Sequence, residues 1–107
     1  MKGQREKRKP EPREKDITKS IRDLLKMLGV FHWKHWGGPM GTDGVPDILG
    51  VWQGRFLGIE VKRPSGIVSP AQEAFIANIN KAGGLAFVAR SVDDVIDHLG
   101  VRDRFLV

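Results

Sequence analysis

The chain contains no cysteine, which excludes both a disulfide framework and a cysteine-based zinc site. It also lacks any apolar run close to the roughly 20 residues that a membrane-spanning helix needs. Its N-terminus is rich in charge and has no apolar centre of the kind found in secretory signal peptides. With 107 residues, we expect one small domain with one modest core, located in the cytoplasm and away from membranes.

Positive charge is concentrated at the N-terminus. The net charge is +5, and residues 1–15 hold seven Lys or Arg against three Glu, so this segment alone carries +4. Residues 1–13 also contain two prolines and almost nothing apolar, which predicts a flexible basic arm. Such arms bind nucleic-acid phosphates through charge attraction, although a merely solubilising tail is the alternative. The candidate DNA contacts in the arm are Lys7, Arg8, Lys9 and Arg13.

Hydrophobic periodicity predicts an α/β domain over residues 14–107. Gln53 and Gly54 join two strand-like segments and predict a tight antiparallel hairpin. In chain order, we predict a helix over 17–28, strands over 30–36, 46–52 and 55–63, a helix over 70–82, a strand over 85–90 and a helix over 92–98. The second helix is the best marked, because Ser69 suits its N-cap, Pro70 its first turn and Gln72 a capping box.

The order α-β-β-β-α-β-α also predicts the topology of the sheet. A strand, a crossover helix and a second strand form a right-handed unit with parallel strands. Together with the hairpin, this unit predicts a mixed central sheet flanked by helices on both faces.

Acidic residues converge at one end of the predicted hairpin. Glu60 and Lys62 project from the same face of their strand, and Asp47 occupies the position expected opposite Glu60 when the turn lies at residues 53–54. Two neighbouring carboxylates repel each other unless a cation lies between them, and hard oxygen ligands favour Mg²⁺. Taken alone, Glu60 and Lys62 could simply form a solvated strand face.

Four segments in order carry a family resemblance: "GVPDILGV", "FLGIEVKRPSG", "VSPAQEAF" and "AGGLAFVARSVDDV". From about residue 14 to 95 the sequence resembles the virus-type replication-repair nuclease (VRR-NUC) family of the PD-(D/E)xK superfamily. The resemblance implies a restriction-endonuclease-like core and a Mg²⁺-dependent DNA endonuclease, with Mn²⁺ able to substitute. It also implies a bacterial or phage-infected cell as the setting.

The resemblance further implies roles for individual residues. Asp47 and Glu60 match the metal-binding acids, and the backbone carbonyl of Val61 matches an additional ligand. Lys62 matches the lysine that orients or activates the attacking water and offsets charge on the phosphate. Gln72 matches a glutamine beside the catalytic site, although its capping-box position gives it a purely structural alternative.

Other candidates depend on less specific signals. Glu14 matches a catalytic acid of the first helix that could bind a second metal ion. Asp16 is an alternative for this acid, and Glu14 could instead interact with the helix dipole. Lys34 and Arg63 are further candidate DNA contacts. Trp33 is either a core residue or a DNA contact that stacks on bases.

The residues give the least information about the DNA substrate and the oligomeric state. A chain with one active site needs a partner to cut a four-way junction symmetrically, so we expect a homodimer of Holliday-junction-resolvase type that acts on branched DNA. Apolar residues for an interface occur at Trp36, Met40 and 105–107, unless they fold back on the core. The alternatives are a nuclease for flaps, nicks or duplex DNA, a non-catalytic DNA-binding module of the same fold, and a scaffold with a surface ion cluster.

Overall fold

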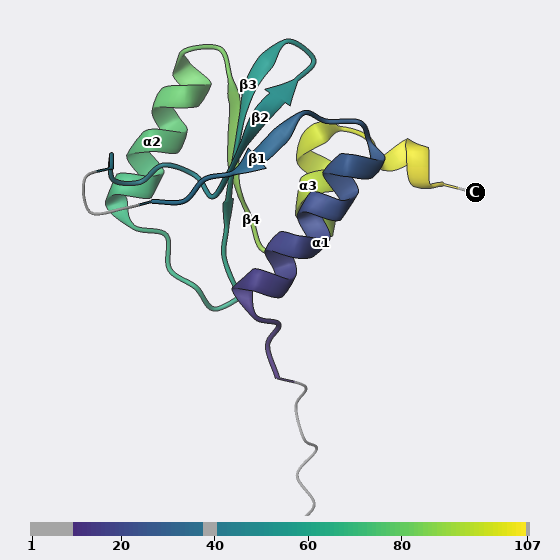
Figure 1. The fold of residues 1–107 in the computed structure, drawn as a ribbon, viewed down its shortest axis with the longest axis horizontal. Helices are drawn as coiled ribbons and strands as arrows, with labels where there is room; N and C mark the ends of the chain where they lie inside the picture. The colour runs from purple at the N-terminus through teal and green to yellow at the C-terminus, as the bar shows by residue number, and fades with distance from the viewer. Residues whose placement is uncertain (1–9, 38–40, 107) are drawn as a thin grey trace, which may run out of the picture.

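A mixed four-stranded sheet forms the centre of the protein (Figure 1). The computed structural model describes residues 10–37 and 41–106. In chain order, the elements are α1 (Glu14–Met27), β1 (His32–Lys34), β2 (Ile48–Trp52), β3 (Arg55–Val61), α2 (Pro70–Lys81), β4 (Leu85–Ala89), α3 (Val92–Leu99) and the 3-10 helix η1 (Arg102–Phe105). The strands lie in the order β1-β2-β3-β4, with β3 and β4 parallel and the other two pairs antiparallel. The predicted order and the mixed sheet are confirmed.

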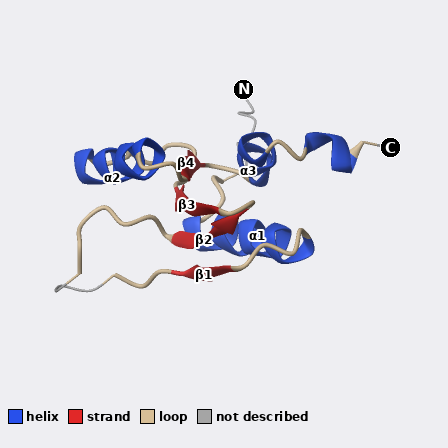
Figure 2. Ribbon diagram, turned by 90° about the horizontal axis from the view of Figure 1, so that it is seen from above, coloured by secondary structure: helices blue, strands red, loops and turns tan. Residues whose placement is uncertain are grey.

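Helices cover both faces of the sheet, as Figure 2 shows: α1 and α3 lie on one face and α2 on the other. The main core lies on the α1 and α3 side, where apolar residues at helical spacing in α1 are buried against the strands and α3. This burial of one helix stripe follows from the 3.6-residue period. None of the helices described in residues 10–37 and 41–106 is long and apolar enough to cross a membrane.

The face covered by α2 is thinner. Ile79 is the buried residue of this helix, and a Cβ added at Gly58 would lie 3.1 Å from both the Ile79 side chain and Pro46. The missing side chain at Gly58 therefore lets α2 and the loop before β2 lie close to β3. The capping box at the start of α2 is confirmed, with Ser69 as N-cap and Gln72 as its partner.

The first strand is shorter than predicted. Residues 30–36 alternate like a strand, but only His32–Lys34 form β1, because this edge strand pairs with just three residues of β2. Phe31 and Trp33 are 71% and 41% exposed, and their ring centroids lie 5.6 Å apart. The alternative that Trp33 is a core residue is therefore wrong.

Candidate active site

Asp47 is held at the end of the β2–β3 hairpin. The last residue pair between β2 and β3 lies one position closer to the turn than Asp47 and Glu60. The two acids therefore continue the same register. The backbone N–H of Val61 donates a 2.9 Å hydrogen bond to Oδ2 of Asp47, and the backbone carbonyl of Asp47 accepts one of 2.7 Å from the N–H of His35. Asp47 is thus tied to a strand on each side of it.

Glu60 is a buried carboxylate. Only 3% of its side chain is exposed, and its Oε2 lies 3.8 Å from Nζ of Lys62. Burial, followed by the neighbouring Asp47 carboxylate, raises the pKa of Glu60 to about 8, while Lys62 opposes the rise and Glu14 adds to it. The structure therefore brings Asp47, Glu60 and Lys62 together and shows that the two acids repel each other when both are ionised.

Gln72 connects the helix cap to this carboxylate. Its Oε1 accepts a 2.9 Å hydrogen bond from the N–H of Ser69, which completes the capping box. Its Nε2 donates a 3.0 Å hydrogen bond to Oε2 of Glu60. The two roles considered for Gln72 therefore coexist, because each uses a different end of the amide.

The carboxylate oxygens of Glu60 and Asp47 that do not take part in these hydrogen bonds fit a divalent cation. Oε1 of Glu60 is buried and has no hydrogen-bond partner within the described residues, although buried polar atoms are nearly always satisfied. The other oxygen of Asp47, Oδ1, lies 3.8 Å from Nζ of Lys34. Among the described residues, no group of three or more His, Asp or Glu side chains is placed so that it could hold a metal ion. A site with two carboxylates suits Mg²⁺, which keeps several waters and binds few protein carboxylates.

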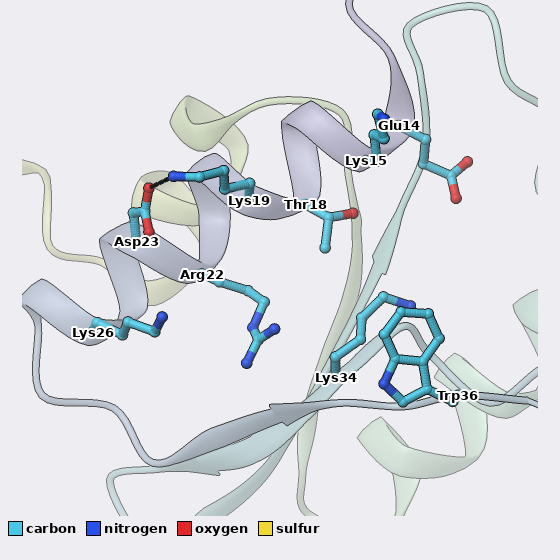
Figure 3. A pocket seen from close by; sticks show the side chains of 9 residues that line it. All are labelled: Glu14, Lys15, Thr18, Lys19, Arg22, Asp23, Lys26, Lys34 and Trp36. Carbon is cyan, nitrogen blue, oxygen red and sulfur yellow. Dashed lines mark hydrogen bonds and ion pairs between the residues drawn. The ribbon is translucent and has the colours of Figure 1, made fainter.

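The first turn of α1 presents two acids in different directions. Asp16 forms a 3.0 Å ion pair with Arg13 and lines a small hollow beside Arg90. Glu14 instead lines a groove together with Lys34 (Figure 3), and its charge acts on Glu60. The geometry thus brings Glu14, rather than Asp16, towards the two carboxylates; its role in metal binding stays a prediction.

The candidate DNA contacts have different surroundings. Lys34 lies close to the site, 3.8 Å from Oδ1 of Asp47. Arg63 is half exposed and forms a 2.7 Å ion pair with Glu11, and Arg13 is exposed and paired with Asp16. Lys7, Arg8 and Lys9 lie outside the described residues. The assignment of these residues to DNA remains a prediction.

The loop after Lys62 has two anchors that the sequence did not reveal. Glu11 accepts hydrogen bonds from the N–H and the hydroxyl of Ser65 and from Arg63. These contacts lower the pKa of Glu11, and the hydrogen bond from the Ser65 hydroxyl has the largest effect. Nη1 of Arg90 donates to three backbone carbonyls, those of residues 63, 64 and 66. No spacing rule joins residues so distant in sequence, so only the folded chain identifies these anchors.

Comparisons with known proteins agree with the fold. The model of the VRR-NUC domain family matches residues 4–93. A solved structure titled "VRR_NUC domain protein" is similar over 85% of this chain and 88% of its own, with a TM-score of 0.70 and 20% sequence identity, which shows a shared fold. No curated protein matches the sequence.

Proposed function

This chain belongs to the VRR-NUC family of nucleases, and we propose that it is a Mg²⁺-dependent DNA endonuclease. The observation that carries the proposal is the buried carboxylate of Glu60 beside Asp47, with an oxygen that has no partner in the described chain. A non-catalytic module or scaffold would gain stability from replacing such a pair with neutral residues. Its presence supports a site that binds a cation.

Each residue has a distinct task in this proposal. Asp47 and Glu60, with the carbonyl of Val61, would hold the ion, which when bound supplies positive charge that acidifies an attacking water and offsets charge on the phosphate. Lys62 adds a second positive charge beside Glu60 and orients the water. Gln72 fixes the carboxylate of Glu60 through its Nε2 hydrogen bond, and Oε1 of Glu60 has no partner among the described residues.

A variant that removes the charge of Asp47 but keeps its hydrogen bond tests the proposal. Asn at position 47 can still accept the hydrogen bond from Val61, so Asp47→Asn should fold normally. We expect cleavage of plasmid and branched DNA in Mg²⁺ to fall at least about 100-fold, since electrostatic groups of an active site contribute roughly that much. Asp103→Asn is the matched control, because Asp103 is an exposed acid of η1.

A second pair of variants tests the lysine. Lys62→Gln should lower the rate at saturating DNA by a similar factor, whereas Lys81→Gln at the exposed end of α2 should leave it unchanged. If Asp47→Asn and Lys62→Gln both cut DNA at the wild-type rate, the proposed active site is wrong. Wild-type cleavage in EDTA would instead reject the requirement for a metal.

We further propose that the substrate is branched DNA and that a homodimer makes paired cuts in four-way junctions. Supporting a dimer, Leu106 does not fold back on the core and is 71% exposed. Trp36 is exposed as well, but it lines the groove beside Lys34 and the proposed interface does not require it; Met40 and Val107 lie outside the described residues. Light scattering should give twice the chain mass of 12.0 kDa. A panel of junctions, flaps, nicks and plain duplex should show the fastest cutting on junctions, with symmetric nicks on opposite strands.

A further inference from the structure

A basic groove runs between α1 and β1, with Trp36 on the β1 side (Figure 3). Its volume is about 480 Å³, within the range of about 300–1,000 Å³ of pockets that hold small molecules. At one end lie Glu14, whose charge acts on Glu60, and Lys34, which is 3.8 Å from Asp47. The Lys34 end of the groove therefore lies beside the candidate active site.

One wall of this α1–β1 groove is a stripe of positive charge. Four cations of α1 line it, at spacings of four, three and four residues that place them on one helix face: Lys15, Lys19, Arg22 and Lys26. The stripe extends about 16 Å along the helix, the length of roughly five stacked nucleotides. With Lys34 there are five cations and two acids in the lining, a net charge of +3, and Asp23 is already paired with Lys19 at 2.9 Å.

The opposite wall contributes an exposed aromatic ring. Trp36 follows β1 and is 80% exposed. Nζ of Lys34 lies 4.6 Å from the centre of the ring, a distance typical of cation–π attraction. This contact holds the indole at the mouth of the groove and leaves most of the ring surface open to solvent, where a flat partner can stack.

We infer that the α1–β1 groove binds an unpaired DNA strand that continues from the cleaved phosphate, with a base stacked on Trp36. A positive groove that follows the backbone, together with an exposed aromatic platform, is the arrangement by which proteins hold single strands. A duplex offers phosphates to the α1 stripe but keeps its bases stacked inside, so it leaves the indole without a partner. The inference rests on the proposed function and adds how the branch is held: a strand that becomes unpaired where the crossover of a junction opens would enter this groove, as would the free strand of a flap or a splayed arm.

The base-stacking part is tested by binding in EDTA, where no cleavage is expected. Fluorescence anisotropy would compare an oligothymidine strand, an abasic strand of equal length and a blunt duplex. Trp36→Ala should weaken binding of oligothymidine roughly 5- to 150-fold and leave the abasic strand and the duplex within about twofold. Trp36→Phe should restore most of the affinity, because Phe keeps an aromatic face.

The charge stripe is tested by the salt dependence of the same binding. The double variant Lys15→Ala/Lys26→Ala spares the ion pair of Lys19, and should reduce the slope for oligothymidine by about 1.4, since each lost phosphate contact on a single strand contributes about 0.7. A control pair on other elements, Lys81→Ala/Arg104→Ala, should leave the slope unchanged. Melting temperatures close to wild type would show that the variants are folded.

The outcomes separate this inference from the proposed function. Equal loss on oligothymidine, abasic strand and duplex, or no loss in any variant, would overturn the inference even if the enzyme cuts DNA in Mg²⁺. The expected binding pattern without any cleavage would support the groove and reject the endonuclease. Faster cutting of a splayed duplex than of a blunt one, reduced by Trp36→Ala and restored by Trp36→Phe, would support both.

Discussion

Replacing Glu60 with Gln should stabilise the metal-free protein at neutral and alkaline pH, although it removes a proposed catalytic group. The pKa of Glu60 is raised from 4.5 to about 8, first by burial and then by Asp47. Between these values the folded protein keeps a proton that the unfolded chain releases. The contribution of Glu60 to the free energy of unfolding is therefore largest below about pH 4.5 and falls as the pH rises towards 8.

The size of this effect follows from the pKa. Each pH unit within the window lowers the free energy of unfolding by at most about 1.4 kcal/mol, so the loss at pH 7 is up to about 3 kcal/mol. For a domain of this size, 1 kcal/mol shifts Tm by roughly 4–8 °C. Gln is uncharged at every pH, so Glu60→Gln should melt on the order of 10 °C above wild type at pH 7.

Differential scanning fluorimetry from pH 4.5 to 8.5 measures this difference. In EDTA, the wild-type Tm should fall across the window while that of Glu60→Gln changes less, and the two should converge near pH 4.5. Adding Mg²⁺ at pH 8 should raise the wild-type Tm and leave the variant unchanged, because a ligand stabilises only the state that binds it. Glu73→Gln, the same change at an exposed position of α2, should follow wild type.

Two results would refute this reasoning. A variant that melts below wild type throughout the pH range would mean that Glu60 is ionised and well compensated in the folded protein. A Mg²⁺ response of equal size in both proteins would mean that the ion binds elsewhere. Either result concerns binding and folding alone, so it needs no assumption about the DNA substrate.

Three further predictions address the surroundings of the site. Gln72→Glu should preserve the helix cap, since Glu also fills the capping-box position, but cleavage should fall at least about 10-fold because like charges would meet at Glu60; circular dichroism checks the helix. Gly44→Ala should lower the free energy of unfolding, measured in urea, by at least about 2 kcal/mol, because Gly44 has φ +83° and a Cβ there would overlap the backbone of α2. The control Gly37→Ala should have little effect, because no described atom lies within 4 Å of a Cβ at that position. Deleting residues 1–9, which removes five basic residues and one acid, should flatten the salt dependence of duplex binding without changing Tm, and an unchanged slope would show that the arm does not contact phosphates.

The parts of the fold that depend on local chemistry could be predicted from the sequence. The hairpin turn at residues 53–54 fixed the register that places Asp47 opposite Glu60, because a two-residue turn leaves one pairing for all later positions. The capping box of α2 could likewise be predicted from Ser69 and Gln72 alone. Both features involve residues close in sequence, where spacing determines geometry.

Features that join distant segments could not be predicted. The contact of Glu11 with Ser65 spans 54 residues, and nothing in either neighbourhood identifies the partner. The length of β1 was overestimated because alternation describes a possible strand, whereas pairing at an edge is limited by the partner strand. The two first-turn acids of α1 differ only in the direction in which the helix points them, which is set once α1 packs on the sheet.

The residues of the candidate active site also stabilise the fold. Oδ2 of Asp47 accepts the N–H of Val61 where the backbone pairing of β2 with β3 ends, and Gln72 begins α2 while it holds Oε2 of Glu60. Each acid thus gives one oxygen to the fold and retains the other for the site. Because the same hydrogen bonds that end the hairpin and start the helix also orient the carboxylates, the fold itself brings the two negative charges together. The repulsion between them is the structural feature that a cation would relieve, and it explains why stability and metal binding should change together when Glu60 loses its charge.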